Sequence, residues 1–188
     1  MGDRIAEAMR SVPRRGFLPP KQQRHAGQDR ALPIGHRGTC SQPTTLRRML
    51  SHLDPQPGQR VLDVGSGSGW STALLSCLIG PDGWVLGVEI EPGLVEQGRA
   101  NLEANAVARA SIEQAVVGQL GWPARAPYDR ILVSAESDRL PDSLVEQLSD
   151  GGRLVIPVAG RMVTATRRGA QVQQSTEGWY RFVPLRED

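Results

Sequence analysis

From Gly58 onward, short apolar runs alternate with segments in which apolar residues recur at helical spacing. The runs of strand length are "RVLDVG", "WVLGVEI", "ASIEQAV", "DRILVSA" and "RLVIPVA". The segments of helical period are "STALLSCLIG", "PGLVEQGRANLEAN" and "PDSLVEQLSDGG". This alternation predicts an α/β fold in which helices cover both faces of a mostly parallel central sheet.

Two of these helical segments carry further signals. The apolar stripe of "PGLVEQGRANLEAN" is formed by Leu94, Val95, Gly98 and Leu102. The segment "PDSLVEQLSDGG" can begin as a helix at Pro141, places Leu148 on its apolar face and should end at Gly151. After Val158, the pieces "MVTATRR", "AQVQQS" and "WYRFVPL" are separated by glycines, which predicts antiparallel strands at one side of the sheet.

The chain before Gly58 has a different pattern. It predicts a short helix over Ile5–Arg10, a Pro/Gly-punctuated loop over Pro13–Gly38 and a helix over Pro43–Leu53. Ordered loops of such length in a compact domain are usually binding or lid elements. We therefore expect one domain over residues 1–188, with residues 1–57 as a substrate-side extension, 58–158 as a ligand-binding α/β core and 159–188 as C-terminal strands.

Composition narrows the possible functions. The 22 basic and 20 acidic residues give a net charge of +2, too little to imply a nucleic-acid partner. A local basic excess near the N-terminus fits a solvated face better than an acidic-peptide site; it consists of Arg10, Arg14, Arg15, Lys21 and Arg24. No apolar run approaches a membrane span and no secretory signal is evident, so we expect a cytoplasmic protein without a membrane partner. Two cysteines and three scattered histidines match no metal or disulfide pattern.

The segment "VLDVGSGSGW" carries the strongest chemical signal. Gly65, Gly67 and Gly69 directly follow a predicted strand and lead into a predicted helix, the context of a nucleotide-type ligand site. A dinucleotide turn would have its third glycine where this chain has Trp70, which argues against NAD or FAD. Glycine spacing alone is a weak signal of a ligand site, because glycines can also be present only to allow a tight turn between a strand and a helix.

Two acidic residues support a ligand at this turn. Glu89 ends the next strand about 20 residues beyond Gly69, where a carboxylate can accept hydrogen bonds from both ribose hydroxyls. Asp63 precedes the turn and is expected at its mouth, where it could receive an amine-bearing end of a ligand. Two acids without a phosphate-binding Lys or Arg favour a cationic nucleoside. S-adenosylmethionine fits this description.

The residues also resemble one family along the whole chain. The segments "DRALPIGHRGTCSQP", "VLDVGSGSG", "LGWP", "YDRILVSA", "GGRLVIPVAG" and "FVPL", in this order, resemble protein-L-isoaspartate (D-aspartate) O-methyltransferases. The resemblance implies a Rossmann-like class I methyltransferase, acting as a monomer. It also implies methyl transfer from S-adenosylmethionine, which becomes S-adenosylhomocysteine, to the α-carboxylate of L-isoaspartyl and D-aspartyl residues in damaged proteins. The ester then closes to a succinimide, whose hydrolysis restores some aspartate.

The resemblance assigns roles to particular residues. It implies that Ser41 lies at the methyl-transfer site, where it would orient the carboxylate; a Ser41 that caps the following helix is the structural alternative. The residues expected at the cofactor are Asp63, Gly65, Ser66, Gly67, Gly69, Glu89 and Val117. Those expected at the substrate are Ile34, Gly35, Thr39, Cys40 and Val158.

The chain departs from the family pattern in several places. The family has "GDG" where this chain has Val116, Val117 and Gly118, so the acid that reads the adenine amino group is missing; Gln114 or Gln119 could replace it. Gly27 stands where the family has tyrosine, although Asp29 is retained, and the short end could trim the substrate slot. These departures leave open a relative that methylates normal aspartate side chains, or a binding protein with a weakened cofactor site. RNA or small-molecule methylation is less favoured, because no base-stacking motif or basic groove is evident.

Overall fold

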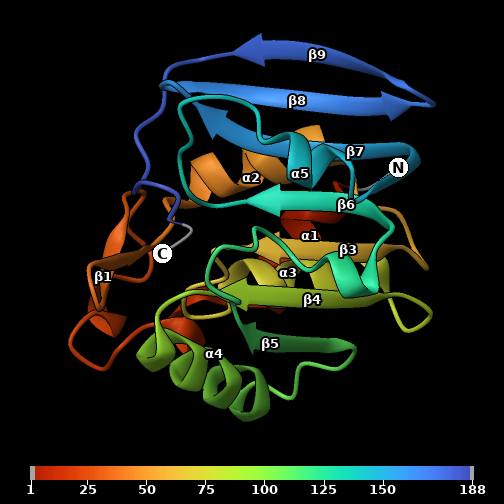
Figure 1. Cartoon of the computed structure of the whole chain (residues 1–188). Coiled ribbons are helices and arrows are strands. Elements are labelled where there is room, and N and C mark those ends of the chain that lie inside the picture. The colour runs from red at the N-terminus through yellow and green to blue at the C-terminus, as the bar shows by residue number, and fades with distance from the viewer. Residues whose placement is uncertain (1–2, 187–188) are drawn as a thin grey trace.

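Seven strands form one central sheet in the computed structural model, which describes residues 3–186 (Figure 1). Their bounds are β3 (Arg60–Val64), β4 (Trp84–Glu89), β5 (Ala110–Gln114), β6 (Tyr128–Val133), β7 (Leu148–Val158), β8 (Arg161–Arg168) and β9 (Gln171–Glu177). In the order β5-β4-β3-β6-β7-β8-β9, the strands from β5 to β7 are parallel, and β8 and β9 continue the sheet antiparallel. This confirms the predicted α/β class with antiparallel C-terminal strands.

Within residues 3–186, five α-helices and three 3-10 helices pack around the sheet. The α-helices are α1 (Arg4–Ser11), α2 (Pro43–Leu53), α3 (Trp70–Ile79), α4 (Pro92–Ala104) and α5 (Asp142–Val145). The 3-10 helices are η1 (Arg14–Phe17), η2 (Gln23–His25) and η3 (Pro123–Arg125). The helix predicted over Pro43–Leu53 has these same bounds, and those predicted over Ile5–Arg10 and from Pro92 are also confirmed.

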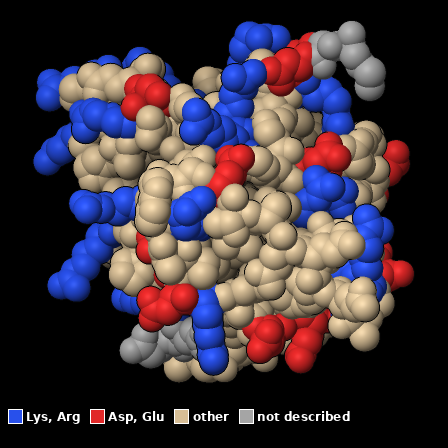
Figure 2. Space-filling view, turned by 90° about the horizontal axis from the view of Figure 1, so that it is seen from above, with Lys and Arg blue, Asp and Glu red and all other residues tan. Residues whose placement is uncertain are grey.

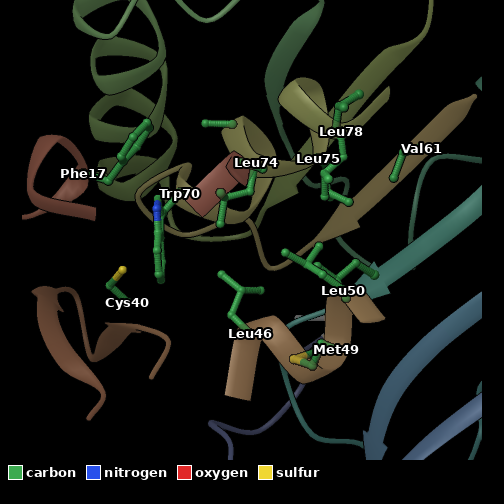
Figure 3. Packing of buried hydrophobic residues seen from close by; sticks show 14 of the residues in the cluster. Phe17, Cys40, Leu46, Met49, Leu50, Val61, Trp70, Leu74, Leu75 and Leu78 are labelled. Carbon is green, nitrogen blue, oxygen red and sulfur yellow. The ribbon is translucent and has the colours of Figure 1, made fainter. Parts of the chain in front are cut away.

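Alternating side chains of the parallel strands build one core on each face of the sheet. In β3, Val61 points into the core shared with α1 to α4, whereas Leu62 and Val64 point into the opposite core, which α5 helps to cover. Figure 3 shows the first core, where Leu74 and Leu75 of α3 lie near side chains of α2 and β3. The two faces are thus covered unequally, with most helical residues on the α3 side.

Three expectations about elements need correction. The helix predicted from Pro141 to Gly151 ends after Val145, because Leu148 begins β7 and pairs with Tyr128 of β6. The piece "WYRFVPL" forms no strand; its backbone runs past Glu136, which exchanges hydrogen bonds with Val183 and Leu185, and one bridge forms at Pro184.

The third correction concerns the N-terminal loop over Pro13–Gly38. It contains η1 and η2, and it ends in a hairpin of strands β1 (Leu32–Gly35) and β2 (Gly38–Cys40). The hairpin stands at the carboxyl edge of the large sheet, apart from the other strands (Figure 1). It is therefore placed to form one wall of a site at that edge.

Charged side chains are distributed over the surface. Figure 2 shows Lys and Arg interspersed with Asp and Glu on the face seen from above. Of the basic residues near the N-terminus, Arg10, Arg15, Lys21 and Arg24 are exposed, as the solvated-face interpretation predicts. Arg14 is an exception, since its side chain is buried.

Candidate functional site

A cavity of about 330 Å³ opens at the carboxyl ends of the parallel strands. It lies between the β3–α3 turn, the end of β4, the end of β6 and the β1–β2 hairpin. Ligands of open α/β sheets bind at this edge. The predicted site residues that line it are Ile34, Thr39, Cys40, Ser41, Gly65, Ser66, Gly67 and Glu89.

The three glycines of the β3–α3 turn allow a backbone that side chains would strain. Gly65, Gly67 and Gly69 all have positive φ, at 73°, 53° and 89°. A Cβ on Gly67 would lie 3.2 Å from Cδ1 of Ile34, and one on Gly69 would lie 3.3 Å from the carbonyl oxygen of Gly98 in α4. Gly69 does not line the cavity; its part is to let α3 and α4 approach.

Glu89 is fixed at the end of β4 by two backbone amides. Its Oε2 accepts from the amide of Gly67 at 2.9 Å, and its Oε1 accepts from the amide of Glu91 at 3.0 Å. Each carboxylate oxygen keeps further acceptor capacity, because an ionised carboxylate offers about four lone-pair sites. Glu89 can therefore accept from two hydroxyl groups of a ligand while it shapes the glycine turn.

Asp63 does not take the place expected for it. It shares its side of β3 with Val61, so its carboxylate is fully buried against α3, where Oδ2 accepts from the hydroxyls of Ser71 and Thr72 at 2.7 Å. It is not among the residues that line the cavity, so the expectation that it meets a ligand amine at the mouth of the turn needs correction. Burial raises the pKa of Asp63 to about 6.

This raised pKa predicts a pH-dependent effect on stability. The pKa of about 6 in the folded protein exceeds the value of 3.8 in a free carboxyl. The folded protein therefore favours the protonated Asp63 carboxyl. The stability that this preference adds is complete below pH 3.8 and is lost as the pH rises through 6. Asp63→Asn should have a higher free energy of unfolding than the wild type at pH 7.5, by on the order of 3 kcal/mol. Chemical denaturation between pH 4.5 and 7.5 should show this advantage shrink at the acidic end; an advantage that is constant or reversed would contradict a raised pKa at Asp63.

Among the described residues, none that lines the β5 end of the cavity is an acid in place of the missing one. Val116 lines the cavity, whereas Val117 is 74% exposed and does not, and the contact of Val117 with the cofactor stays a prediction. Of the two glutamines considered, Gln119 lines the cavity and Gln114 does not; the Gln114 amide donates to the carbonyl of Ile90 at 2.6 Å. Gln119 is therefore the polar side chain placed to read a ligand here.

We expect Gln119→Ala to raise the dissociation constant of S-adenosylhomocysteine by about fivefold, the effect of one neutral hydrogen bond. Gln114→Ala is the matched control and should change it less. Isothermal titration calorimetry measures both constants. Equal affinities of Gln119→Ala and the wild type would remove Gln119 from the site.

The hairpin wall brings Ser41 to the cavity. Ser41 follows β2 and precedes α2, whose N-cap residue is Gln42, and the Thr44 amide in the first turn is taken by Asp29. The alternative role of Ser41 as the cap of this helix is therefore wrong. Gly35 at the hairpin tip and Val158 at the end of β7 do not line the cavity, and their contact with a substrate stays a prediction.

Several lining residues were not predicted. One of them is Ser134, whose hydroxyl is buried without a hydrogen-bond partner among the described residues. The hydroxyl of Ser66, a residue expected at the cofactor, is buried in the same way. Ser134 follows β6 directly, so its place after a parallel strand could have pointed to it. Glu91 forms ion pairs at the rim with His36 at 3.3 Å and with Arg186 at 3.8 Å; no local pattern marks that tertiary contact.

The described part of the chain lacks features of two other classes of function. Within residues 3–186, no three His, Cys, Asp or Glu side chains gather as a metal site. In the same residues, no helix combines the length and the hydropathy needed to cross a bilayer.

Comparison with known proteins gives a consistent result. The sequence model of the protein-L-isoaspartate(D-aspartate) O-methyltransferase family matches residues 1–188. The protein-L-isoaspartate O-methyltransferase of Aeropyrum pernix is 51% identical over 156 residues, or 82% of this chain and 60% of that relative, so the chain spans less than two thirds of the relative's length. That of Methanopyrus kandleri is 42% identical over 189 residues, or 97% of this chain and 83% of that relative.

A solved structure agrees with these relatives. It is named protein-L-isoaspartate O-methyltransferase and has a TM-score of 0.88 at 26% identity, over 98% of this chain and 61% of that chain. The likeness thus covers the hairpin, the glycine turn and the C-terminal strands together. The chain belongs to the protein-L-isoaspartate(D-aspartate) O-methyltransferase family.

Proposed function

We propose that this protein transfers a methyl group from S-adenosylmethionine to the α-carboxylate of L-isoaspartyl and D-aspartyl residues in damaged proteins, which starts their repair through a succinimide. The observation that carries the proposal is a family match over residues 1–188, joined to a cavity that both Glu89 and Ser41 line. The acceptors would be isoaspartyl-containing peptides and proteins. The monomeric state, the cytoplasmic location and the lack of a nucleic-acid partner stay predictions.

The residues of the cavity fit the cofactor. The glycine turn leaves backbone space that a Cβ on Gly67 would reduce, and Glu89 offers two acceptor oxygens to ribose hydroxyls. The buried Ser66 hydroxyl has no partner within the described chain and can bond a polar group of a ligand. When bound, S-adenosylmethionine would supply a methyl group on a positively charged sulfur.

The acceptor needs no general base. An α-carboxyl group has a reference pKa of about 3.3 to 3.7, so fewer than roughly one in a thousand is protonated at pH 7. Burial raises the pKa of the Cys40 thiol, which keeps this lining residue protonated rather than nucleophilic. The task of the protein is to place an already charged oxygen and to exclude water, and positioning of this kind supplies about 7 to 11 kcal/mol. Ser41 is the hydroxyl placed to orient that oxygen.

Paired peptides test the proposal. Two peptides of identical sequence, one with an isoaspartyl and one with a normal aspartyl residue, are incubated with the protein and methyl-labelled S-adenosylmethionine. We expect a base-labile methyl ester on the isoaspartyl peptide, with initial rates at least about tenfold above those on the aspartyl peptide. Preference for the aspartyl peptide would indicate the relative that modifies normal side chains. Transfer to neither peptide would contradict the proposed function.

A further inference from the structure

Arg14 is a buried cation that the proposed chemistry does not yet use. It belongs to η1, and its residue is 5% exposed. Within residues 3–186, no carboxylate lies within ion-pair distance of it. Burying an unpaired charge is costly, and an apolar side chain of similar size would avoid that cost. An arginine at this place therefore carries a cost that its other contacts must offset.

The guanidinium contacts the residue that precedes Ser41. Its Nη2 donates to the carbonyl of Cys40 at 2.7 Å, and its Nε donates to Sγ of Cys40 at 3.4 Å. The same group stacks over the ring of Trp70 at 5.4 Å. Figure 3 shows Trp70, the first residue of α3, lying near both Phe17 and Cys40. Arg14 thus connects the end of β2 to the start of the helix that follows the glycine turn.

Two further hydrogen bonds tie Arg14 to the loop before the hairpin. Nη1 donates to the carbonyl of Gln28 at 3.2 Å, and Nη2 donates to that of Arg30 at 2.9 Å. Between them lies Asp29, whose carboxylate accepts from the amide of Thr44 at 2.9 Å and from its hydroxyl at 2.8 Å. The loop therefore contacts the chain on both sides of Ser41, through Arg14 before it and through Asp29 after it.

We infer that Arg14 is a positioning residue for methyl transfer: its buried fork, together with Asp29, fixes the segment that carries Ser41 against the glycine turn. The inference deepens the proposed function and rests on it. Arginine suits the role because it presents five donors in one plane, whereas a lysine ammonium is a point charge that cannot reach the same three carbonyls and the thiol in this geometry. Misplacing a reacting group by about 1 Å can reduce a rate by about 100-fold.

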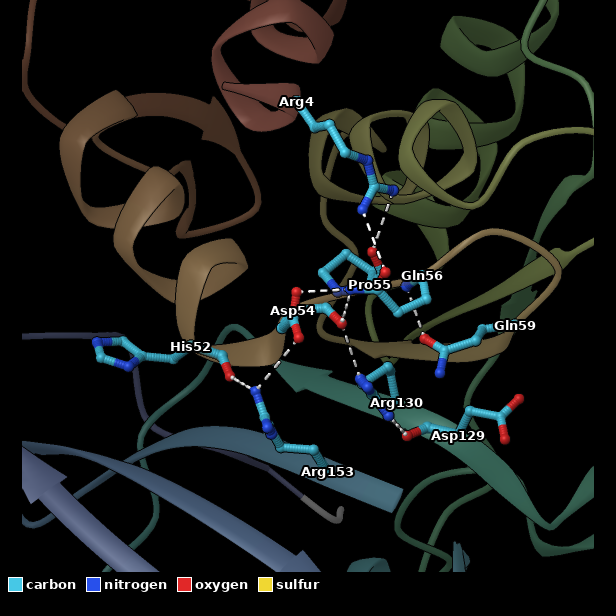
Figure 4. Close-up of polar contacts among 9 residues, drawn as sticks. All are labelled: Arg4, His52, Asp54, Pro55, Gln56, Gln59, Asp129, Arg130 and Arg153. Carbon is cyan, nitrogen blue, oxygen red and sulfur yellow. Dashed lines mark hydrogen bonds and ion pairs between the residues drawn. The ribbon is translucent and has the colours of Figure 1, made fainter. Parts of the chain in front are cut away.

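The test compares Arg14→Lys with a matched control, Arg4→Lys. Arg4 is also an arginine that donates to backbone carbonyls, those of Pro55 at 3.3 Å and Leu78 at 2.8 Å. Figure 4 shows its guanidinium directed at Pro55 and Gln56, and Arg4 is not among the residues that line the cavity. Arg4 makes three hydrogen bonds and Arg14 makes four, so a purely structural effect of losing a guanidinium would lower stability in both variants. We expect Arg14→Lys alone to lower kcat for the isoaspartyl peptide, by about 10- to 100-fold.

Two further readouts separate positioning from loss of folding. We expect the dissociation constant of S-adenosylhomocysteine to stay within about threefold of the wild type in Arg14→Lys, because the hydrogen bonds of Arg14 go to Gln28, Arg30 and Cys40 and not to Glu89 or the glycines of the turn. We expect hydrogen exchange of the amides in residues 38–46 to accelerate at least about tenfold in Arg14→Lys and not in Arg4→Lys. The exchange measurement needs no substrate. It therefore reports how firmly residues 38–46 are held even if the protein is inactive.

Failure of the Arg14 role and failure of the proposed function give different results. Unchanged exchange in residues 38–46, or equal losses of kcat in the two lysine variants, would overturn the role of Arg14. A wild type that is inert on the isoaspartyl peptide would instead remove the proposed function. If Arg14→Lys does not fold, Asp29→Asn replaces it, since Asp29 is exposed and contacts the same segment from the other side. It should reproduce the lower kcat and faster exchange with unchanged cofactor affinity, and wild-type values for both would overturn the inference.

Discussion

We expect Glu89→Gln to weaken binding of S-adenosylhomocysteine by about 100-fold. The Glu89 carboxylate accepts two backbone amides that shape the turn, and the amide nitrogen of a glutamine would face one of these donors without accepting from it. Hydrogen bonds to charged groups contribute about 1.5 to 3 kcal/mol each, and about 3 kcal/mol corresponds to 100-fold in a dissociation constant. Calorimetric titration of the variant and the wild type measures the difference.

Glu91→Gln is the control for this experiment. Glu91 is the next acid along the chain and lies at the cavity rim, where it forms ion pairs with His36 and Arg186. Partly exposed ion pairs contribute about 0 to 1 kcal/mol, so this variant should lose no more than about fivefold in affinity. Similar losses in both variants would mean that general charge near the cavity, rather than the Glu89 contacts, determines binding.

Ser41→Ala should lower kcat/KM for an isoaspartyl peptide by about 10- to 100-fold, because one hydrogen bond to a charged carboxylate is lost. The dissociation constant of S-adenosylhomocysteine should stay near that of the wild type, since Glu89 and the glycine turn keep their own hydrogen bonds when the Ser41 hydroxyl is removed. Ser41→Thr keeps the hydroxyl and should retain most of the activity. Initial rates at varied peptide concentration, with saturating cofactor, measure the effect.

Ser51→Ala provides the matched control for Ser41. Ser51 is an exposed serine of α2 whose hydroxyl donates to the carbonyl of Arg47 at 3.0 Å, so its loss removes a hydroxyl far from the hairpin. Its activity should equal that of the wild type. If Ser41→Ala retains full kcat/KM as well, the hydroxyl does not orient the acceptor and the carboxylate must be placed by other groups.

The sequence predicted the parts of the fold that depend on local periodicity. The parallel strands, α2 and α4 follow from spacing of apolar residues, and the glycine turn and Glu89 follow from their order along a strand, turn and strand. Helix α5 was predicted too long because the apolar face that includes Leu148 also suits a buried strand. Pairing with Tyr128 of β6, a contact distant in sequence, decides between the two.

The errors at the site have a similar origin. Asp63 was placed at the cavity from its distance along the chain, but alternation in β3 turns its side chain toward Ser71 and Thr72 of α3. Arg14 was grouped with surface cations, because only the folded chain brings the carbonyls of Gln28, Arg30 and Cys40 around it. Motif spacing thus identifies the walls of the cavity, whereas the contacts that position those walls come from tertiary structure.

The most direct test of the central claim, that the glycine turn and Glu89 bind an adenosyl sulfonium cofactor, is a pair of calorimetric titrations of the wild-type protein. One uses S-adenosylhomocysteine and the other uses NAD. We predict one S-adenosylhomocysteine bound per chain and no measurable binding of NAD. Absence of S-adenosylhomocysteine binding, or tighter binding of NAD, would contradict the claim.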